Sequence, residues 1–120
     1  DHCTWIAETL RQHSISAEPL VGRMTKKQRI EVLERADKRE IQVVCATTVA
    51  DEGLDLPSLD TVVLTTPSKA LGRIQQRIGR VMRPHPKKKS PIVIDCVDDI
   101  GAMRGLARKR SRLYARVGCQ

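Results

Sequence analysis

The sequence is poor in aromatic residues: its 120 residues include one Trp, one Tyr and no Phe. Trp5 and Tyr114 therefore offer little surface for stacking on nucleic-acid bases. Apolar runs are also short, and none approaches the roughly 20 residues that a membrane-spanning helix needs. No signal peptide is apparent, because a polar, helix-like pattern follows Asp1 at once. These absences predict an intracellular protein without a membrane partner.

The cysteines and histidines are not spaced as metal ligands. Cys3, Cys45, Cys96 and Cys119 contain no C-x-x-C pair, so a zinc site has no local support. Cys45 and Cys96 fall within apolar, strand-like runs, where cysteine usually acts as a small hydrophobic residue. We therefore expect no metal site and no disulfide, as is usual in a reducing compartment.

The motifs of self-sufficient catalytic sites are missing as well. The sequence has no G-x-x-x-x-G-K-[ST] loop that could cradle the phosphates of a nucleotide. It has neither the H-E-x-x-H motif of zinc proteases nor the G-x-S-x-G motif of α/β hydrolases. A complete nucleotide-hydrolysing site within this chain is therefore not expected.

Positive charge is concentrated in the second half of the chain. The formal net charge is +8 overall, divided into −3 for residues 1–68 and +11 for residues 69–120. A basic half of this strength favours a polyanionic partner, such as nucleic acid or a nucleotide. A basic surface that merely keeps the protein in solution would account for the charge equally well. The sequence motifs are therefore needed to distinguish these two interpretations.

Helix-like and strand-like segments alternate along the chain. We expect helices at about 3–13, 25–37, 70–83 and 100–116, and strands at 18–21, 41–46, 61–64 and 91–97. Thr25 and Gln28 form a predicted capping box, and Ile30, Leu33 and Ala36 are the predicted apolar face of the helix that follows. Continuous Val/Ile runs separated by helices predict an α/β fold with a parallel sheet flanked by helices on both faces.

The segment 46–57 leaves a buried-type strand and carries polar groups toward a turn. Thr47 and Thr48 follow the strand, and the chain then passes through Gly53 to the carboxylate of Asp55. Hydroxyl and amide groups at a strand end can hold phosphate oxygens, and a carboxylate can hold a ribose hydroxyl. An ordinary strand-to-turn connection would contain the same residue types.

The segment 75–84 has an unusual arrangement of arginines. Arg77, Arg80 and Arg83 are spaced by three, so on a helix they form one ridge. Gly79 lies inside the predicted helix, where glycine costs roughly 1 kcal/mol relative to alanine. A solvated basic face would explain the arginines but not the glycine, whereas closely approaching phosphates would explain both.

Together these segments resemble the C-terminal RecA-like domain of superfamily 2 helicases. Residues 46–57 look like motif V of that family, and residues 76–83 match its motif VI, Q-R-x-G-R-x-x-R. Residues 21–23 resemble an earlier loop of the domain. Residues 91–99, with Tyr114 after an Arg-rich helix, resemble the closing segment of the DNA-translocase branch, which includes repair helicases, type III restriction motors and phage-like helicases.

The resemblance implies an ATP site shared between two RecA-like domains. An upstream domain of the same protein would bring the P-loop and the Mg²⁺ ligands. Arg80 and Arg83 would be catalytic arginine fingers that reach the γ-phosphate of ATP. Asp55 would contact the ribose with Gly53 allowing close approach, and Gln76 would couple the nucleotide to domain closure.

The resemblance also implies contacts with a nucleic-acid track. Thr47, Thr48 and Arg23 would bind its backbone, with DNA a more probable track than RNA. Residues 1–120 would then be one domain of a larger protein, without the domain's first strand. An alternative from another class is a non-catalytic nucleic-acid-binding module that uses the same basic surface and no ATP.

Overall fold

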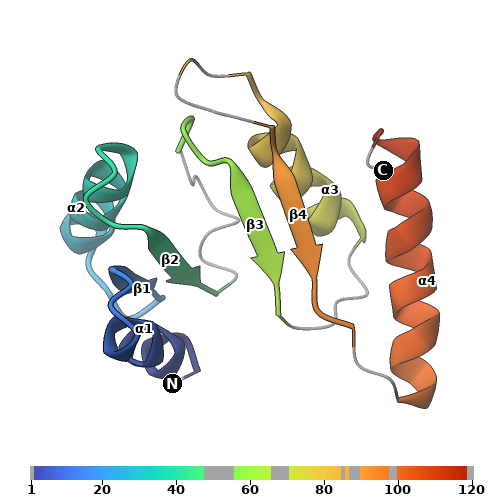
Figure 1. The fold of residues 1–120 in the computed structure, drawn as a ribbon, viewed down its shortest axis with the longest axis horizontal. Coiled ribbons are helices and arrows are strands. Elements are labelled where there is room, and N and C mark those ends of the chain that lie inside the picture. The colour runs from blue at the N-terminus through green and yellow to red at the C-terminus, as the bar shows by residue number, and fades with distance from the viewer. Residues whose placement is uncertain are drawn as a thin grey trace. The chain divides into compact units, whose positions relative to one another are not determined.

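The computed structural model describes residues 2–47, 56–65, 71–84, 86, 90–97 and 100–118. The chain divides into two compact units, unit 1 (residues 1–56) and unit 2 (residues 57–120). Helices and strands follow one another in the order α1 (His2–Gln12), β1 (Ala17–Leu20), α2 (Lys26–Asp37), β2 (Val43–Ala46), β3 (Thr61–Leu64), α3 (Leu71–Met82), β4 (Ile92–Asp95) and α4 (Gly101–Arg116) (Figure 1). Each predicted helix and strand is present, which confirms the α/β class.

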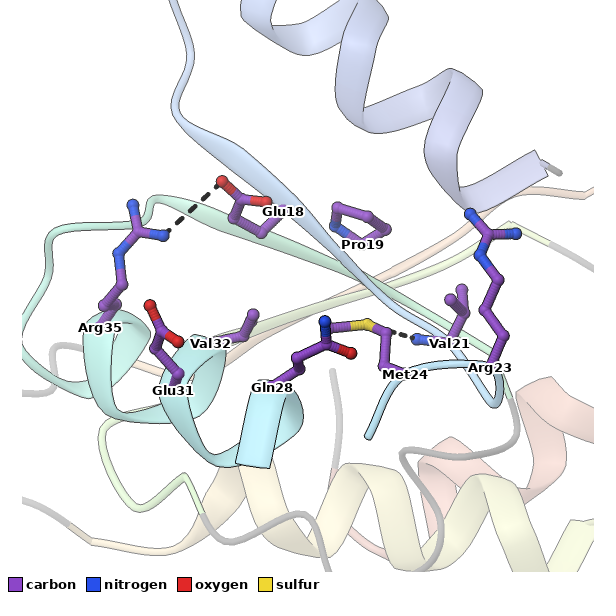
Figure 2. A pocket seen from close by; sticks show the side chains of 9 residues that line it. All are labelled: Glu18, Pro19, Val21, Arg23, Met24, Gln28, Glu31, Val32 and Arg35. Carbon is purple, nitrogen blue, oxygen red and sulfur yellow. Dashed lines mark hydrogen bonds and ion pairs between the residues drawn. The ribbon is translucent and has the colours of Figure 1, made fainter. Parts of the chain in front are cut away.

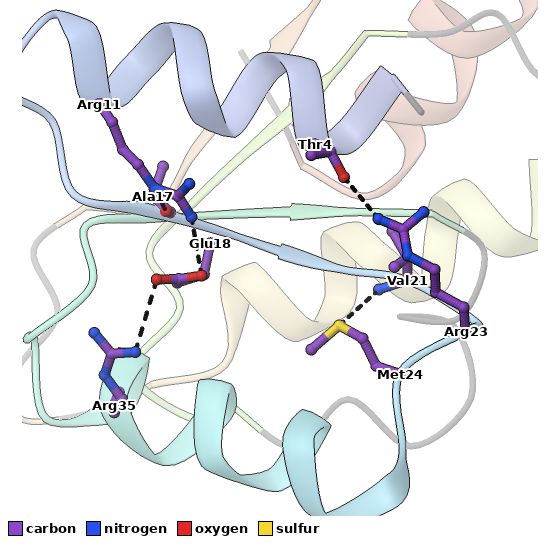
Figure 3. A network of polar contacts seen from close by, with 8 residues as sticks. All are labelled: Thr4, Arg11, Ala17, Glu18, Val21, Arg23, Met24 and Arg35. Carbon is purple, nitrogen blue, oxygen red and sulfur yellow. Dashed lines mark hydrogen bonds and ion pairs between the residues drawn. The ribbon is translucent and has the colours of Figure 1, made fainter.

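Unit 1 is built around a parallel pair of strands. β1 and β2 pair from Ala17 with Val43 to Leu20 with Ala46. Helices α1 and α2 lie on opposite faces of this pair (Figure 3). The core beneath α1 consists of small apolar residues: Cys3, Ala7, Ala17, Val21 and Cys45.

The two thiols in this core act as small apolar groups. Burial raises the pKa of the Cys45 thiol, and the neighbouring Cys3 raises it further. Cys45 therefore stays protonated at neutral pH. The expectation for Cys45 is confirmed. Cys96, in unit 2, is exposed, and the same expectation for it is wrong, because Cys96 continues the alternation of the exposed Ile92 and Ile94 on β4.

Helix α2 begins at the predicted capping box. The Thr25 hydroxyl accepts a hydrogen bond from the Gln28 amide at 3.2 Å, and the Gln28 side chain accepts one from the Thr25 amide at 2.8 Å. Two amides that the first turn of a helix leaves without partners are thereby satisfied. Ala36 is buried as predicted, but the prediction for Ile30 is wrong: Val32 is buried and Ile30 is 46% exposed. Val32 and Ala36, four residues apart, define the buried stripe.

Unit 2 repeats the parallel arrangement with both of its helices on one face. β3 and β4 pair from Thr61 with Ile92 to Leu64 with Asp95. Leu64, Ile78 of α3 and Leu113 of α4 form one buried cluster, so α3 and α4 pack against the same face of these strands. On the other face Val63, Ile92 and Ile94 are about half exposed, which follows from the alternation of side chains along a strand.

Helix α4 is attached to the end of β4 by a buried polar cluster. Arg110 donates two hydrogen bonds to the Asp95 carboxylate, from Nε at 2.7 Å and from Nη2 at 3.1 Å. The Tyr114 hydroxyl donates to the same carboxylate at 2.6 Å. The Arg110 side chain is only 3% exposed. Tyr114 thus lies within α4, inside the helix predicted at about 100–116.

The electrostatics of the cluster favour a charged Arg110–Asp95 pair and a neutral Tyr114 side chain. The hydrogen bond to Asp95 raises the pKa of Arg110, and burial opposes that rise. Burial raises the pKa of Tyr114 well above its usual range, and the hydrogen bond to Asp95 adds to the effect. The folded state therefore holds the phenolic proton more tightly than the unfolded chain does.

We predict that Tyr114→Phe lowers the free energy of unfolding by about 1.5–3 kcal/mol, the usual value of a hydrogen bond to a charged group. Because the pKa of Tyr114 is raised on folding, this stabilisation is complete below about pH 10 and is lost as the pH rises beyond that value. Urea unfolding of both proteins at pH 7 and at pH 10 to 11 measures both effects. An equal loss of stability in both proteins at high pH would contradict the assignment.

Candidate nucleotide and nucleic-acid interface

Helix α3 turns one polar face outward. Ile78 and Val81 are buried at 1% and 0% exposure, so they fix the rotation of the helix about its axis. Positions 76, 79, 80 and 83 lie on the opposite side, because residues three, four and seven apart share a helix face. Gln76, Gly79 and Arg83 are exposed there and Arg80 is partly exposed. We call these four residues the α3 face.

Arg77 and Arg83 depart slightly from the ridge predicted by the sequence. Arg77 lies on the flank of the α3 face and is partly buried. Arg83 directly follows the last helical residue, Met82. The α3 face therefore presents two guanidinium groups, those of Arg80 and Arg83, together with the Gln76 amide.

Gly79 leaves bare backbone in the middle of the α3 face. A Cβ atom built on Gly79 meets nothing within 4 Å, so packing within the chain does not require a glycine here. A helix-interior glycine that no internal contact demands lowers stability by about 0.5–1 kcal/mol relative to alanine. Close approach of a ligand to the helix surface would explain why the residue is glycine.

Thr47 and Arg23 lie at one edge of the strands of unit 1. Thr47 follows β2, and its amide donates to the Leu20 carbonyl at 3.4 Å. Arg23 belongs to the loop that leaves β1 directly after Leu20. Because the two strands are parallel, their carboxyl ends meet at the same edge. The structure thus brings together two residues that the sequence predicts to bind a nucleic-acid backbone.

The loop that carries Arg23 is held in place by three further contacts. Arg23 donates to the Thr4 hydroxyl at 3.1 Å (Figure 3). Arg29 donates to the Gly22 carbonyl at 2.9 Å, and the Met24 amide donates to the Val21 carbonyl at 3.1 Å. The backbone of this loop is therefore preorganised, although its residues 22 and 23 are exposed.

A pocket of about 300 Å³ lies between β1 and α2. Figure 2 shows its nine lining residues: Glu18, Pro19, Val21, Arg23, Met24, Gln28, Glu31, Val32 and Arg35. Glu18 pairs with Arg35 across the wall at 3.7 Å and with Arg11 at 3.0 Å. Since these opposite charges offset one another, the pocket selects neither an anion nor a cation, and we assign it no ligand.

Three of the predicted site residues, Thr48, Gly53 and Asp55, lie outside the described residues. Their roles stay predictions. Within the described part of the chain, no group of three His, Cys, Asp or Glu side chains could hold a metal ion. No helix in that part is long and apolar enough to cross a membrane.

Sequence reasoning missed Arg29 and the Asp95–Arg110–Tyr114 cluster. Asp95 could have been noticed, because it is the one charged residue within the apolar segment 91–97. Its partners could not, since they lie 15 and 19 residues away along the chain.

Comparison with known families identifies the chain. The family described as the helicase conserved C-terminal domain matches residues 1–85, and the chain belongs to this family. A protein named as a helicase in Sulfolobus islandicus filamentous virus is 37% identical over 92 residues, which cover 77% of this chain and 16% of the viral protein. An ATP-dependent helicase Lhr-Core from Methanocaldococcus jannaschii is 37% identical over 78 residues, which cover 64% of this chain and 9% of that protein. The chain therefore spans a small part of the curated relatives it matches.

Solved helicase structures share the fold. The RNA helicase Prp28 from Chaetomium thermophilum, bound to ADP, superposes with a TM-score of 0.76 at 21% identity, covering 96% of this chain and 27% of Prp28. The Hef helicase domain from Pyrococcus furiosus superposes with a TM-score of 0.61 at 30% identity, covering 91% of this chain and 22% of that one. These matches confirm the RecA-like helicase fold expected from the motifs.

We predict that Gly79→Ala raises the free energy of unfolding by about 0.5–1 kcal/mol, because the added methyl group meets no neighbour. The same change should lower nucleic-acid-stimulated ATP hydrolysis by the full-length protein, because the methyl group occupies the centre of the α3 face. Urea unfolding and steady-state hydrolysis measure the two effects.

Gly105→Ala is the matched control, since a Cβ atom at this position of α4 also meets nothing within 4 Å. It should stabilise the fold similarly and leave hydrolysis unchanged. Full hydrolysis by a stabilised Gly79→Ala variant would show that no ligand approaches this surface closely.

Proposed function

We propose that this chain is the second motor domain of an ATP-dependent nucleic-acid helicase or translocase. Its α3 face completes an ATP site whose phosphate-binding loop belongs to an upstream RecA-like domain of the same protein. Family membership and the RecA-like fold support this function. The observation that carries it is the orientation of α3, where buried Ile78 and Val81 direct Gln76 and Arg80 outward, with the exposed Arg83 directly after the helix.

In this proposal Arg80 and Arg83 stabilise the charge that develops as the γ-phosphate is transferred. A guanidinium group suits the task because its planar donors match phosphate oxygens and its charge is permanent. Arginine fingers contribute about 10³–10⁵ in rate to phosphoryl-transfer enzymes. Gln76, on the same face, would sense the nucleotide and couple it to closure of the two domains.

The Mg²⁺ ion that accompanies ATP would be held by the upstream domain. The described residues of this chain contain no group of three His, Cys, Asp or Glu side chains that could hold a metal ion, and the α3 face offers only cationic and neutral groups. Such a face fits the phosphates of ATP and not the metal. Asp55 and Gly53 remain the proposed contacts to the ribose.

The proposed track is a nucleic-acid backbone contacted by the carboxyl-end edge of unit 1. Thr47 and Arg23 lie at that edge, and Thr48 is proposed to join them. Contacts to phosphate and sugar carry little sequence information, which suits a motor that moves along its track. The names of the relatives include RNA helicases. The preference for DNA and the DNA-translocase branch therefore stay predictions, which competition between matched DNA and RNA oligonucleotides would test.

We predict that the 120-residue chain alone does not hydrolyse ATP, because its sequence contains no P-loop to hold the phosphates and the proposed Mg²⁺ ligands belong to the upstream domain. Phosphate release from ATP, measured before and after a second purification, tests this. Steady hydrolysis that persists through repurification would contradict a shared site.

In the full-length protein, Arg83→Ala should lower kcat by about 10³ while changing nucleotide affinity far less, because a finger acts on charge in the transition state. Arg80→Ala should behave similarly. The variants Arg83→Lys and Arg80→Lys should recover only part of the rate, because lysine lacks the planar, bidentate donor geometry of a guanidinium group. Nucleic-acid-stimulated turnover and fluorescent-nucleotide binding measure the two quantities.

Lys38→Ala is a suitable control, because Lys38 is exposed at the end of α2, in the other unit of the chain. It should keep its turnover. If Arg80→Ala and Arg83→Ala also kept near-normal turnover, the α3 face would not contact ATP. The alternative of a non-catalytic nucleic-acid-binding module would then be favoured.

A further inference from the structure

Helix α4 carries a regular ridge of arginines. Arg104, Arg108, Arg112 and Arg116 are each four residues apart, and all four are exposed. With a rise of 1.5 Å per residue, neighbouring members are about 6 Å apart along the axis and the ridge extends for about 18 Å. Lys109 is exposed beside it. We call these four arginines the α4 ridge.

The rotation of α4 is fixed by its buried side. Arg110 and Leu113 are buried, and Tyr114 packs against the same cluster of unit 2. Positions 106, 110, 113 and 117 lie about half a turn from the ridge, as the helical repeat requires. The bidentate bond between Arg110 and Asp95 therefore turns one arginine inward and leaves the other four exposed.

The charges of the ridge are not balanced within the helix. α4 contains no acidic residue. Like charges four residues apart destabilise a helix by about 0.2–0.5 kcal/mol for each pair. A face that only needs to be solvated could use mixed charges and avoid this cost. A partner with regularly spaced negative charges would offset it.

The choice of arginine narrows the chemistry of that partner. Lys109 is the only lysine in α4. Arginine binds phosphate through two parallel hydrogen bonds, whereas lysine acts as a point charge. A row of arginines at a regular spacing of about 6 Å is suited to successive phosphates of a flexible single strand.

We propose that α4 is a second nucleic-acid-binding surface, where the α4 ridge contacts successive phosphates of a nucleic-acid backbone. This surface lies on a different helix from the α3 face, and its residues are not among those that the motifs assign. Its contacts with nucleic acid would be additional to those proposed for Thr47 and Arg23. The proposal does not depend on the arginine-finger role of Arg80 and Arg83.

The test replaces Arg108, Arg112 and Arg116 by glutamine in the full-length protein. Binding of a fluorescein-labelled single-stranded oligonucleotide, without ATP, is measured by anisotropy over a range of salt concentrations. A plot of log affinity against log salt has a negative slope. Each lost phosphate contact should reduce the magnitude of this slope by about 0.7. The triple variant should therefore have a slope shallower by about 2 and a weaker affinity at low salt.

Three further variants separate the effects of charge, position and folding. Replacing Arg108, Arg112 and Arg116 by lysine keeps the charge and should keep most of the slope. Replacing the exposed Lys26, Lys27 and Lys38 of unit 1 by glutamine removes the same charge elsewhere and should leave the slope unchanged. Circular dichroism checks that each variant folds. If the triple variant does not fold, the single change Arg112→Gln still tests the proposal, because it should reduce the magnitude of the slope by about 0.7.

A wild-type slope and affinity in the folded triple glutamine variant would overturn the proposal and would indicate another partner, such as an acidic protein surface. An equal loss in the Lys26, Lys27 and Lys38 variant would also overturn it, since net charge alone would then explain binding. At saturating nucleic acid the triple variant should keep its kcat. Failure of the α4 proposal is thus distinguishable from failure of the arginine-finger proposal. The α4 ridge variants are expected to change the salt slope, whereas the Arg80 and Arg83 variants are expected to change kcat.

Discussion

Burial of Ile78 and Val81 is the constraint on which the proposed ATP chemistry depends. These side chains are the largest fully buried ones in the described part of the chain. Because they are three residues apart on one side of α3, they leave the helix a single rotation, with Gln76, Gly79 and Arg80 directed outward. The apolar core of unit 2 therefore determines which side chains of α3 are exposed. A polar substitution of Ile78 or Val81 would disturb the orientation of the α3 face, although none of the four residues of that face is itself replaced.

Helix α4 uses a polar contact for the same purpose. Its buried side includes an arginine, and Asp95 at the end of β4 neutralises that charge through two hydrogen bonds. Replacing a buried ion pair by apolar residues often leaves stability unchanged, whereas breaking the pair costs about 3–5 kcal/mol. The pair therefore specifies the position and rotation of α4 more than it adds to stability. Its proposed effect on function is indirect, since the pair leaves the α4 ridge exposed.

Local sequence patterns predicted the elements of this fold well. The capping box at Thr25 and the helix over α3 depend on neighbouring residues, and the structure confirms both. The apolar pattern of α2 is weak, so its periodicity did not reveal that Val32, and not Ile30, faces the strands. Short, clear periodicities were therefore reliable and ambiguous ones were not.

Contacts between distant segments could not be predicted in the same way. Arg23 and Thr4 are 19 residues apart, and so are Tyr114 and Asp95. Side chains of these types have many possible partners, and only the folded backbone selects one. The motif in 76–83 predicted which residues carry the chemistry, and that assignment stays a prediction. The orientation of α3 could not be predicted, because it depends on the positions of Ile78 and Val81 in the core.

The most direct test of the central claim is a structure of the full-length protein with ADP–aluminium fluoride and a single-stranded nucleic acid. Our account predicts that the guanidinium groups of Arg80 and Arg83 lie within hydrogen-bonding distance of the fluoride that replaces the γ-phosphate, with the backbone of Gly79 close to the nucleotide. A structure in which both arginines contact the nucleic acid or solvent, while another residue reaches the fluoride, would contradict it.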